Sequence, residues 1–265
     1  MAVLIEWMTR TGGPASLTVF RSVDASFLFA YALAELLFCL LCRGLFGPGD
    51  ALRRAWSFIS WAAACRVAGV LVAGFPPLFR PADAGRDAWL ARAGSVMCGP
   101  LTLVLLGIGL FVVLRLYARV GLLKRPAAAD WIPLTLVAFF LGSQLVELIW
   151  RMATPQQTGR LLAWLNWVVD PLLALLLLEA VLLRRAVVNA GGGLIARCWG
   201  AYAAAILLLV LASAGSWTID LGLLASAHAH TIQFAFSLSA LAFALAPAYQ
   251  IEAIVRATRA GVLEF

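Results

Sequence analysis

Charged residues are scarce in this chain of 265 residues. Asp, Glu, Lys and Arg together form 12% of it, whereas a soluble domain contains about 25%. The hydrophobic share is 63% and the mean hydropathy is +0.96. One soluble core cannot bury an apolar excess of this size. The composition therefore indicates an integral membrane protein and leaves no room for a separate soluble catalytic domain.

Lysine and histidine are almost absent. Lys124 is the single lysine, and His228 and His230 are the two histidines. Two residues apart on a helix, these histidines point in nearly opposite directions, so we predict no metal site and no haem. The remaining basic residues are arginines spread over several connections rather than clustered, which argues against nucleic-acid binding. A strong excess of arginine over lysine, beside abundant Ala, Gly and Leu, is typical of a GC-rich bacterial genome.

The cysteines do not form a disulfide or metal pattern. All of them lie within or at the edge of apolar stretches, where a small buried side chain is the ordinary role. The Cys39-x-x-Cys42 pair shares one helical face but has neither a second pair nor a nearby histidine. We therefore predict no bound cofactor. The five cysteines are Cys39, Cys42, Cys65, Cys98 and Cys198.

Long apolar stretches dominate what is present. About 20 apolar residues are needed for a helix to cross a hydrocarbon layer about 30 Å thick. The sequence predicts an all-α integral membrane protein, a seven-transmembrane-helix bundle over residues 23–254. A short extracytoplasmic segment (1–22) precedes the bundle and a short cytoplasmic tail (255–265) follows it. The predicted spans are 23–46, 53–79, 93–118, 131–152, 161–184, 194–214 and 228–254.

Basic residues set the predicted orientation. They are more numerous in the connections after spans 1, 3 and 5 and after the last span, and such loops face the cytoplasm. This places the N-terminus outside and the C-terminus in the cytoplasm, in a bacterial cytoplasmic (inner) membrane. Trp56 and Trp199 fall at predicted cytoplasmic ends, where we expect them at the membrane–water interface.

Two connections resemble each other. Leu40-Leu41-Cys42-Arg43 leads through a glycine turn to Trp56, and Leu182-Leu183-Arg184-Arg185 leads through three glycines to Trp199. Spans 1–3 and 5–7 are then parallel repeats with span 4 as a linker, a three-one-three layout. The alternative is that any two cytoplasmic hairpins show arginine, glycine and tryptophan in this order.

Several ionisable or polar residues fall inside predicted spans. Such residues are costly in a bilayer and usually face the bundle interior, where they pair. Arg66 is the one basic residue away from the loops, and either Asp170 or Glu35 is a suitable partner. The pair is either a structural contact or part of a polar cavity or proton pathway. The candidates are Glu35, Arg66, Glu147, Asp170, Glu179 and Gln233.

Prolines interrupt three predicted spans. Asp170-Pro171 places a carboxylate beside a missing backbone donor, an arrangement that helps to form polar sites in transporters with broken helices. A simple kink is the alternative reading, because prolines are common in membrane helices. Gly99-Pro100 and Pro247 allow the same two readings.

No catalytic, nucleotide-binding or metal motif is present in the sequence. We therefore favour a non-enzymatic sensor or accessory subunit that lies in the lipid bilayer and binds a partner membrane protein or a hydrophobic ligand. The alternative is a small-solute or proton-coupled transporter with the three-one-three layout. A transporter predicts that Glu35, Arg66 and Asp170 converge on a wet cavity, whereas a sensor or subunit predicts a dry core or an apolar cleft.

Overall fold

The computed structural model describes residues 14–74, 97–123, 161–220 and 229–260, together with residue 94 and single positions between 135 and 149. Within these residues the protein is helical, with short connections and no strand. A π-helical turn, η1 (Met97–Leu101), leads directly into α6. The α-helices are α2 (Pro14–Gly44), α3 (Ala51–Gly74), α6 (Thr102–Arg119), α8 (Leu161–Asn189), α9 (Gly193–Asp220) and α10 (Ala229–Arg259).

The helices have the length and composition of membrane spans. Five segments in the described residues are long and apolar enough to cross a bilayer, and α8 coincides with the predicted fifth span. These helices indicate a multi-pass membrane protein, and each of the six helices overlaps one of the predicted spans. The five segments are Ala25–Gly44, Ala51–Val72, Gly99–Arg119, Gly193–Gly215 and Thr231–Arg259.

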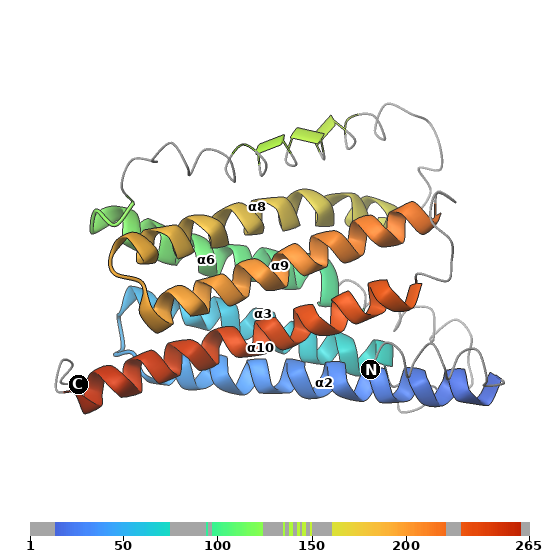
Figure 1. Ribbon diagram of the computed structural model, residues 1–265, viewed down its shortest axis with the longest axis horizontal. Coiled ribbons are helices and arrows are strands. Elements are labelled where there is room, and N and C mark those ends of the chain that lie inside the picture. Colours follow the sequence, from blue (N-terminus) through green and yellow to red (C-terminus); the bar gives the residue numbers. More distant parts are fainter. Residues whose placement is uncertain are drawn as a thin grey trace.

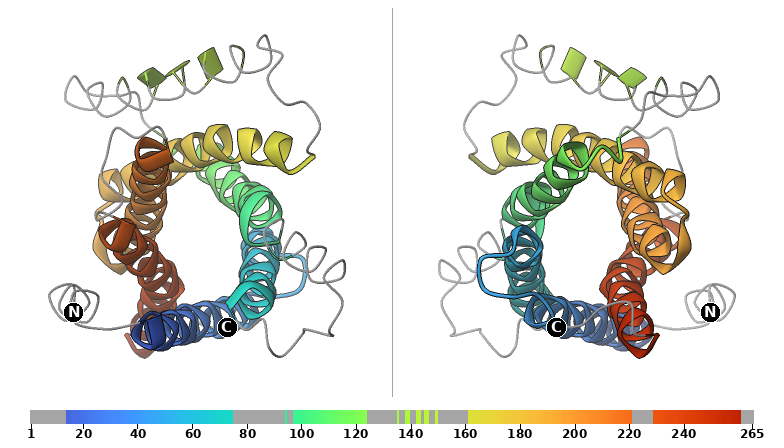
Figure 2. Two further views of the ribbon diagram at one scale, coloured as in Figure 1. Left: turned by 90° about the vertical axis from the view of Figure 1, so that its right-hand side faces the viewer. Right: turned by 90° about the vertical axis from the view of Figure 1, so that its left-hand side faces the viewer.

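Six helices form a closed ring in the order of the sequence. Figure 2 looks along the ring, in which α2, α3, α6, α8, α9 and α10 follow one another and α10 returns to α2. Each helix packs mainly against its two neighbours. The ring therefore places α3 opposite α9 and α2 opposite α8, and side chains from all six helices meet inside it.

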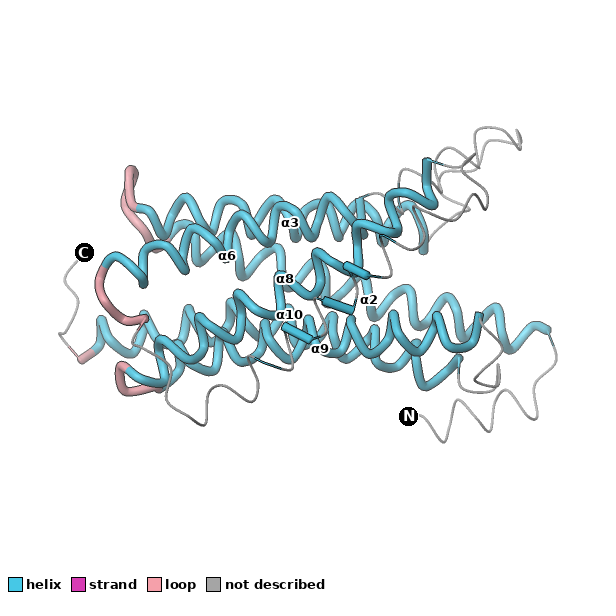
Figure 3. Tube along the Cα trace, turned by 90° about the horizontal axis from the view of Figure 1, so that it is seen from above, coloured by secondary structure: helices cyan, strands magenta, loops and turns pink. Residues whose placement is uncertain are grey.

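The short connections gather at one end of the ring, which we call the connection end (residues 45–50, 120–123 and 190–192; Figures 1 and 3). Apart from Arg66, the arginine side chains that the structure describes belong to the helix ends there. The cytoplasmic side of the ring stays a prediction. These arginines are Arg43, Arg53, Arg54, Arg115, Arg119, Arg184, Arg185, Arg197, Arg256 and Arg259.

The connection between α8 and α9 shows how the chain reverses. Gly191, Gly192 and Gly193 have φ angles of 115°, 76° and 79°, a left-handed region that residues with a Cβ rarely adopt. The N–H of Gly192 donates to the carbonyl oxygen of Val187 at 2.9 Å. The turn thereby caps the last carbonyls of α8 and returns the chain beside it as α9.

The ring consists of two matching halves. The first contains α2, α3 and α6 and the second contains α8, α9 and α10, and the first helices of both halves run in the same direction (Figure 1). In each half the middle helix packs against the first and the third. When α3 and α9 are aligned on Arg54-Ala55-Trp56 and Arg197-Cys198-Trp199, matched residues share their burial. The matched buried pairs are Ala55 and Cys198, Trp56 and Trp199, Ile59 and Tyr202, Ala62 and Ala205, and Ala63 and Ile206.

The positions that the structure describes within the predicted fourth span, 131–152, lie outside this ring. The single positions described between 135 and 149 are helical and exposed, and Figure 2 draws them outside the ring. Phe139, for example, is 76% exposed. Six helices of the ring are among the described residues, and a seventh membrane crossing by residues 131–152 stays a prediction.

Close packing within the first half depends on Gly109 of α6. A Cβ added there would lie 2.6 Å from Cγ1 of Ile59 and 3.1 Å from the carbonyl oxygen of Ala55. Without a side chain, α6 can approach α3 closely, as small residues allow between membrane helices. This contact helps to fix the walls of the site described next.

Candidate functional site

A cavity of about 490 Å³ lies inside the ring, toward the end opposite the connection end. All six helices of the ring contribute to its wall, together with η1. Most of the lining is apolar, and a few polar side chains interrupt it. The lining residues used below are Leu28, Arg66, Val70, Gly99, Pro100, Thr102, Val169, Leu209, Gln233, Phe236, Ser239, Ala240 and Phe243.

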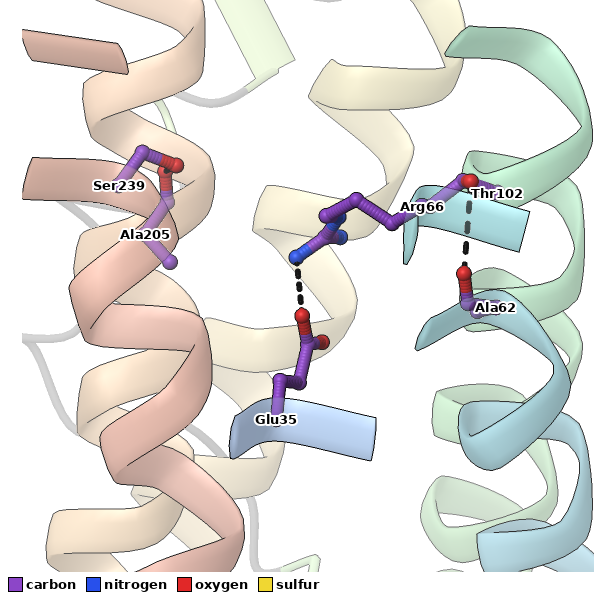
Figure 4. Close-up of polar contacts among 6 residues, drawn as sticks. All are labelled: Glu35, Ala62, Arg66, Thr102, Ala205 and Ser239. Atoms are coloured by element: carbon purple, nitrogen blue, oxygen red, sulfur yellow. Dashed lines mark hydrogen bonds and ion pairs between the residues drawn. The ribbon is translucent and has the colours of Figure 1, made fainter. Parts of the chain in front are cut away.

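An ion pair lies at the polar side of this cavity. Nη1 of Arg66 on α3 donates to Oε2 of Glu35 on α2 at 2.6 Å (Figure 4). The Arg66 side chain is 12% exposed and the Glu35 side chain 2%. The structure thus pairs Arg66 with Glu35, and the side chain of Asp170, the other partner considered from the sequence, lies outside the described residues. Each charge offsets the cost of burying the other.

An aromatic ring covers the same guanidinium. The Arg66 guanidinium carbon lies 3.9 Å from the centroid of Phe243, a residue of α10. A cation over the face of an aromatic ring is attracted by the negative face of the ring, and the attraction is strongest away from water. Arg66 therefore joins α3 to both α2 and α10, at the place where the two halves of the ring meet.

Stacked aromatic residues fill the ring on the connection side of the ion pair. The rings of Trp56 and Trp199 stack with a centroid distance of 6.4 Å, and Tyr202 continues the stack at 5.8 Å from Trp199. Tyr202 in turn meets Phe243 edge to face at 5.9 Å. We call Trp56, Trp199, Tyr202 and Phe243 the aromatic layer, and all four are fully buried.

The aromatic layer corrects one expectation. Trp56 and Trp199 were predicted at the membrane–water interface, but they stack on each other in the centre of the ring. The indole N–H of Trp199 donates to the Tyr117 hydroxyl at 3.3 Å, so it needs no water. Bulky rings from opposite helices fill the space on the ring axis that shorter side chains would leave empty.

Two hydroxyls in the cavity wall make equivalent contacts in the two halves (Figure 4). Thr102 of α6 donates to the carbonyl oxygen of Ala62 at 3.4 Å, and Ser239 of α10 donates to the carbonyl oxygen of Ala205 at 2.8 Å. The two alanines occupy matched positions on α3 and α9. Each hydroxyl thus donates its proton to a carbonyl oxygen within the protein.

The wall also contains a broken helix. Gly99 in η1 has φ −93° and ψ −107°, outside the helical region, and Pro100 follows it. Both residues line the cavity. By contrast, α8 runs unbroken from Leu161 to Asn189 through Pro171. Of the proline signals in the sequence, the break beside the cavity is therefore at Gly99-Pro100 and not at Asp170-Pro171.

The remaining predicted candidates occupy different places. Gln233 of α10 lines the cavity with Arg66. Glu179 of α8 is buried outside the cavity lining, beside Gly107 of α6. The backbone of Asp170 belongs to α8, but its side chain is outside the described residues, as is Glu147. The structure thus brings Glu35, Arg66 and Gln233 together and separates Glu179 from them.

Sequence reasoning missed Phe243, Thr102 and Ser239 as members of the site. A phenylalanine in an apolar span carries no signal by itself, and single hydroxyls are frequent in membrane helices. The repeated Trp56 and Trp199 were the available clue, because matched residues on opposite helices of a ring can meet on its axis.

Comparisons with known protein families, with curated proteins and with solved structures give no match for this chain. Among the residues that the structure describes, no group of three or more His, Cys, Asp or Glu side chains could hold a metal ion. The function is therefore argued from the geometry of the cavity.

Proposed function

We propose that this protein binds a small amphipathic molecule in the cavity inside the ring, which we call the axial cavity. It would act as a non-enzymatic sensor or accessory component of a bacterial inner membrane. The observation that carries the proposal is the cavity itself, which is lined by residues of six helices and has Arg66, the partner of Glu35, in its wall. Its volume of about 490 Å³ falls in the range of about 300–1,000 Å³ typical of small-molecule sites.

The lining selects the chemistry of the ligand. Leu28, Val70 and Phe236 offer apolar surface, while Arg66 and Gln233 place polar side chains at one side. Because Glu35 already balances the charge of Arg66, a full negative charge on the ligand would have no unpaired cation to meet. A neutral molecule with an apolar body and a carbonyl or hydroxyl group fits this lining best.

The aromatic layer favours binding over passage. It fills the ring between the cavity and the connection end, so the cavity is closed on that side. A site with one closed side retains its ligand, as a sensor or ligand-binding subunit requires. A ligand that contacts all six helices also biases how the two halves pack together.

Native mass spectrometry of the purified protein tests this proposal. The variant Ala240→Phe fills the cavity, and Leu211→Phe adds the same ring bulk on the exposed surface of α9. Both variants are first required to melt like the wild type. We expect a bound small molecule on the wild type and on Leu211→Phe, but not on Ala240→Phe. Equal occupancy in all three proteins, or a bound molecule in none, would refute the proposal.

A transporter is the second candidate, and the two matching halves favour it. Parallel repeats and interrupted helices beside a central site are recurring features of secondary transporters, whose halves rock against each other. Cysteine accessibility distinguishes the two candidates. The variant Ala240→Cys is made in a cysteine-free background and treated with an impermeant thiol reagent. If the protein is a transporter, the new cysteine is expected to react with reagent added from either side of the membrane. If the protein is a sensor, the new cysteine is expected to react only with reagent added from the side opposite the connection end.

A further inference from the structure

Each half of the ring contains a buried glutamate on its first helix. Glu35 belongs to α2 and Glu179 to α8, and their residues are 1% and 6% exposed. Glu35 has Arg66 as its partner. In the alignment of α3 with α9 through their tryptophans, the position of Arg66 is taken by Leu209. The second half therefore has the carboxylate without the arginine.

Glu179 lies at the seam where α8 of the second half packs against α6 of the first. A Cβ added to Gly107 of α6 would lie 3.9 Å from Oε2 of Glu179 and 3.3 Å from Cδ2 of Leu176. The missing side chain of Gly107 thus gives the carboxyl group room against the backbone of α6. Oε2 is buried and has no hydrogen-bond partner among the residues that the structure describes.

The helices packed against α8 supply no described counter-charge to this oxygen. They are α6, α9 and η1, and the described side chains of η1 include no titratable group. The arginines of α6 and α9 belong to the connection end, Tyr117 and Tyr202 contact the Trp199 ring, and Cys198 is buried near Cys42. The titratable groups with described side chains on those two helices are Arg115, Tyr117, Arg119, Arg197, Cys198 and Tyr202.

An ionised carboxylate without a partner in apolar surroundings is strongly disfavoured, and such a group takes up a proton instead. Opening the seam between α6 and α8 would admit water and stabilise the ionised form. Proton binding and seam closure are therefore linked, because each favours the other.

We propose that Glu179 is a proton-binding site at the seam between the two halves, protonated when α6 and α8 are packed and deprotonated when water enters the seam. The carboxylate oxygen takes its proton from hydronium and leaves water, and it returns the proton to water on opening. The proposal does not depend on a ligand in the axial cavity, because Glu179 does not line that cavity.

Labelling with dicyclohexylcarbodiimide tests the site, because this apolar reagent modifies protonated carboxyl groups. A glutamate in water ionises at about pH 4.3 and is unreactive near pH 7. We expect Glu179 to be labelled near neutral pH in the folded protein, with labelling lost at alkaline pH. Glu35 is expected to remain unlabelled because Nη1 of Arg66 occupies its Oε2 in a buried ion pair. The exposed Glu252, which is paired with Arg256, is the second internal control.

Peptide mass spectrometry locates the label, and Glu179→Gln is expected to remove it. Glu179→Gln is also expected to melt like the wild type, because the amide resembles the protonated acid. The proposal is overturned if Glu179 is unreactive in the folded protein but reactive after unfolding in detergent. It is equally overturned if sodium ions abolish the labelling, or if Glu179→Gln unfolds the protein, since both results require an ionised carboxylate.

Discussion

Nη1 of Arg66 lies 2.6 Å from Oε2 of Glu35, and this contact joins α2 to α3 inside the ring. The same guanidinium packs on Phe243 of α10. Three helices from both halves thus meet at one cation, which makes the pair a structural contact and a wall of the cavity at once.

Removal of one partner tests the structural role of the pair. Glu35→Leu removes one partner of a buried ion pair, and breaking a buried pair in this way typically costs about 3–5 kcal/mol. We expect the free energy of unfolding to fall by an amount in this range. Thermal or denaturant unfolding in detergent micelles measures the change.

The double variant Glu35→Leu/Arg66→Leu is the matched control. It gives the first half a leucine at position 66, as the second half has in Leu209, and removes the buried carboxylate together with its partner. Replacing a buried ion pair with apolar residues is often neutral or stabilising. We expect the double variant to recover most of the lost stability. A double variant as unstable as Glu35→Leu alone would show that the pair is required for folding.

Removal of each hydroxyl in the cavity wall is expected to lower the free energy of unfolding by a different amount. Polar contacts between membrane helices contribute about 0.6 kcal/mol on average, with a maximum of about 1.7 kcal/mol. Ser239 donates at 2.8 Å and Thr102 at 3.4 Å. Ser239→Ala is therefore expected to lower the unfolding free energy more than Thr102→Val. The reverse order in denaturant titrations would contradict the geometry.

Gly109 predicts a steric effect at the α3–α6 contact. In Gly109→Ala the new methyl would meet Ile59 Cγ1 at 2.6 Å, and overpacking of this kind costs about 1–3 kcal/mol. Gly44→Ala is the control, since a Cβ there meets nothing within 4 Å. We expect a lower melting temperature for Gly109→Ala alone, and equal melting temperatures would argue against this helix contact.

The arginines at the connection end predict the orientation in the membrane. Basic residues in short connections favour the cytoplasm, so a fluorescent protein fused after residue 265 is expected to be fluorescent in bacterial cells. An alkaline phosphatase fused at the same place is expected to be inactive. Active phosphatase at this position would invert the proposed topology.

Sequence patterns located the helices well but not their inward faces. The apolar stretches predicted six helices of the ring because length and composition decide which segments can cross a bilayer. They could not place Trp56 and Trp199 on the axis, since α9 is apolar over most of its length and has no distinct polar face. The inward face is set by packing between helices, which a single sequence does not record.

The proline signals show a second limit. Asp170-Pro171 and Gly99-Pro100 look alike in the sequence, yet α8 continues through Pro171 while the chain leaves helical geometry at Gly99. A glycine before the proline has the conformational freedom to absorb the break. Arg66 was recognisable because a charge in a span needs a partner, whereas the choice of Glu35 required the positions of the helices.

The most direct test of the account is native mass spectrometry of Glu35→Leu/Arg66→Leu beside the wild type. This variant keeps the apolar wall of the cavity but removes the guanidinium that would bind the polar group of a ligand. We predict a folded protein that has lost the small molecule carried by the wild type. Retention of the same molecule at the same occupancy would contradict the claim that the axial cavity, with Arg66 in its wall, is the functional site.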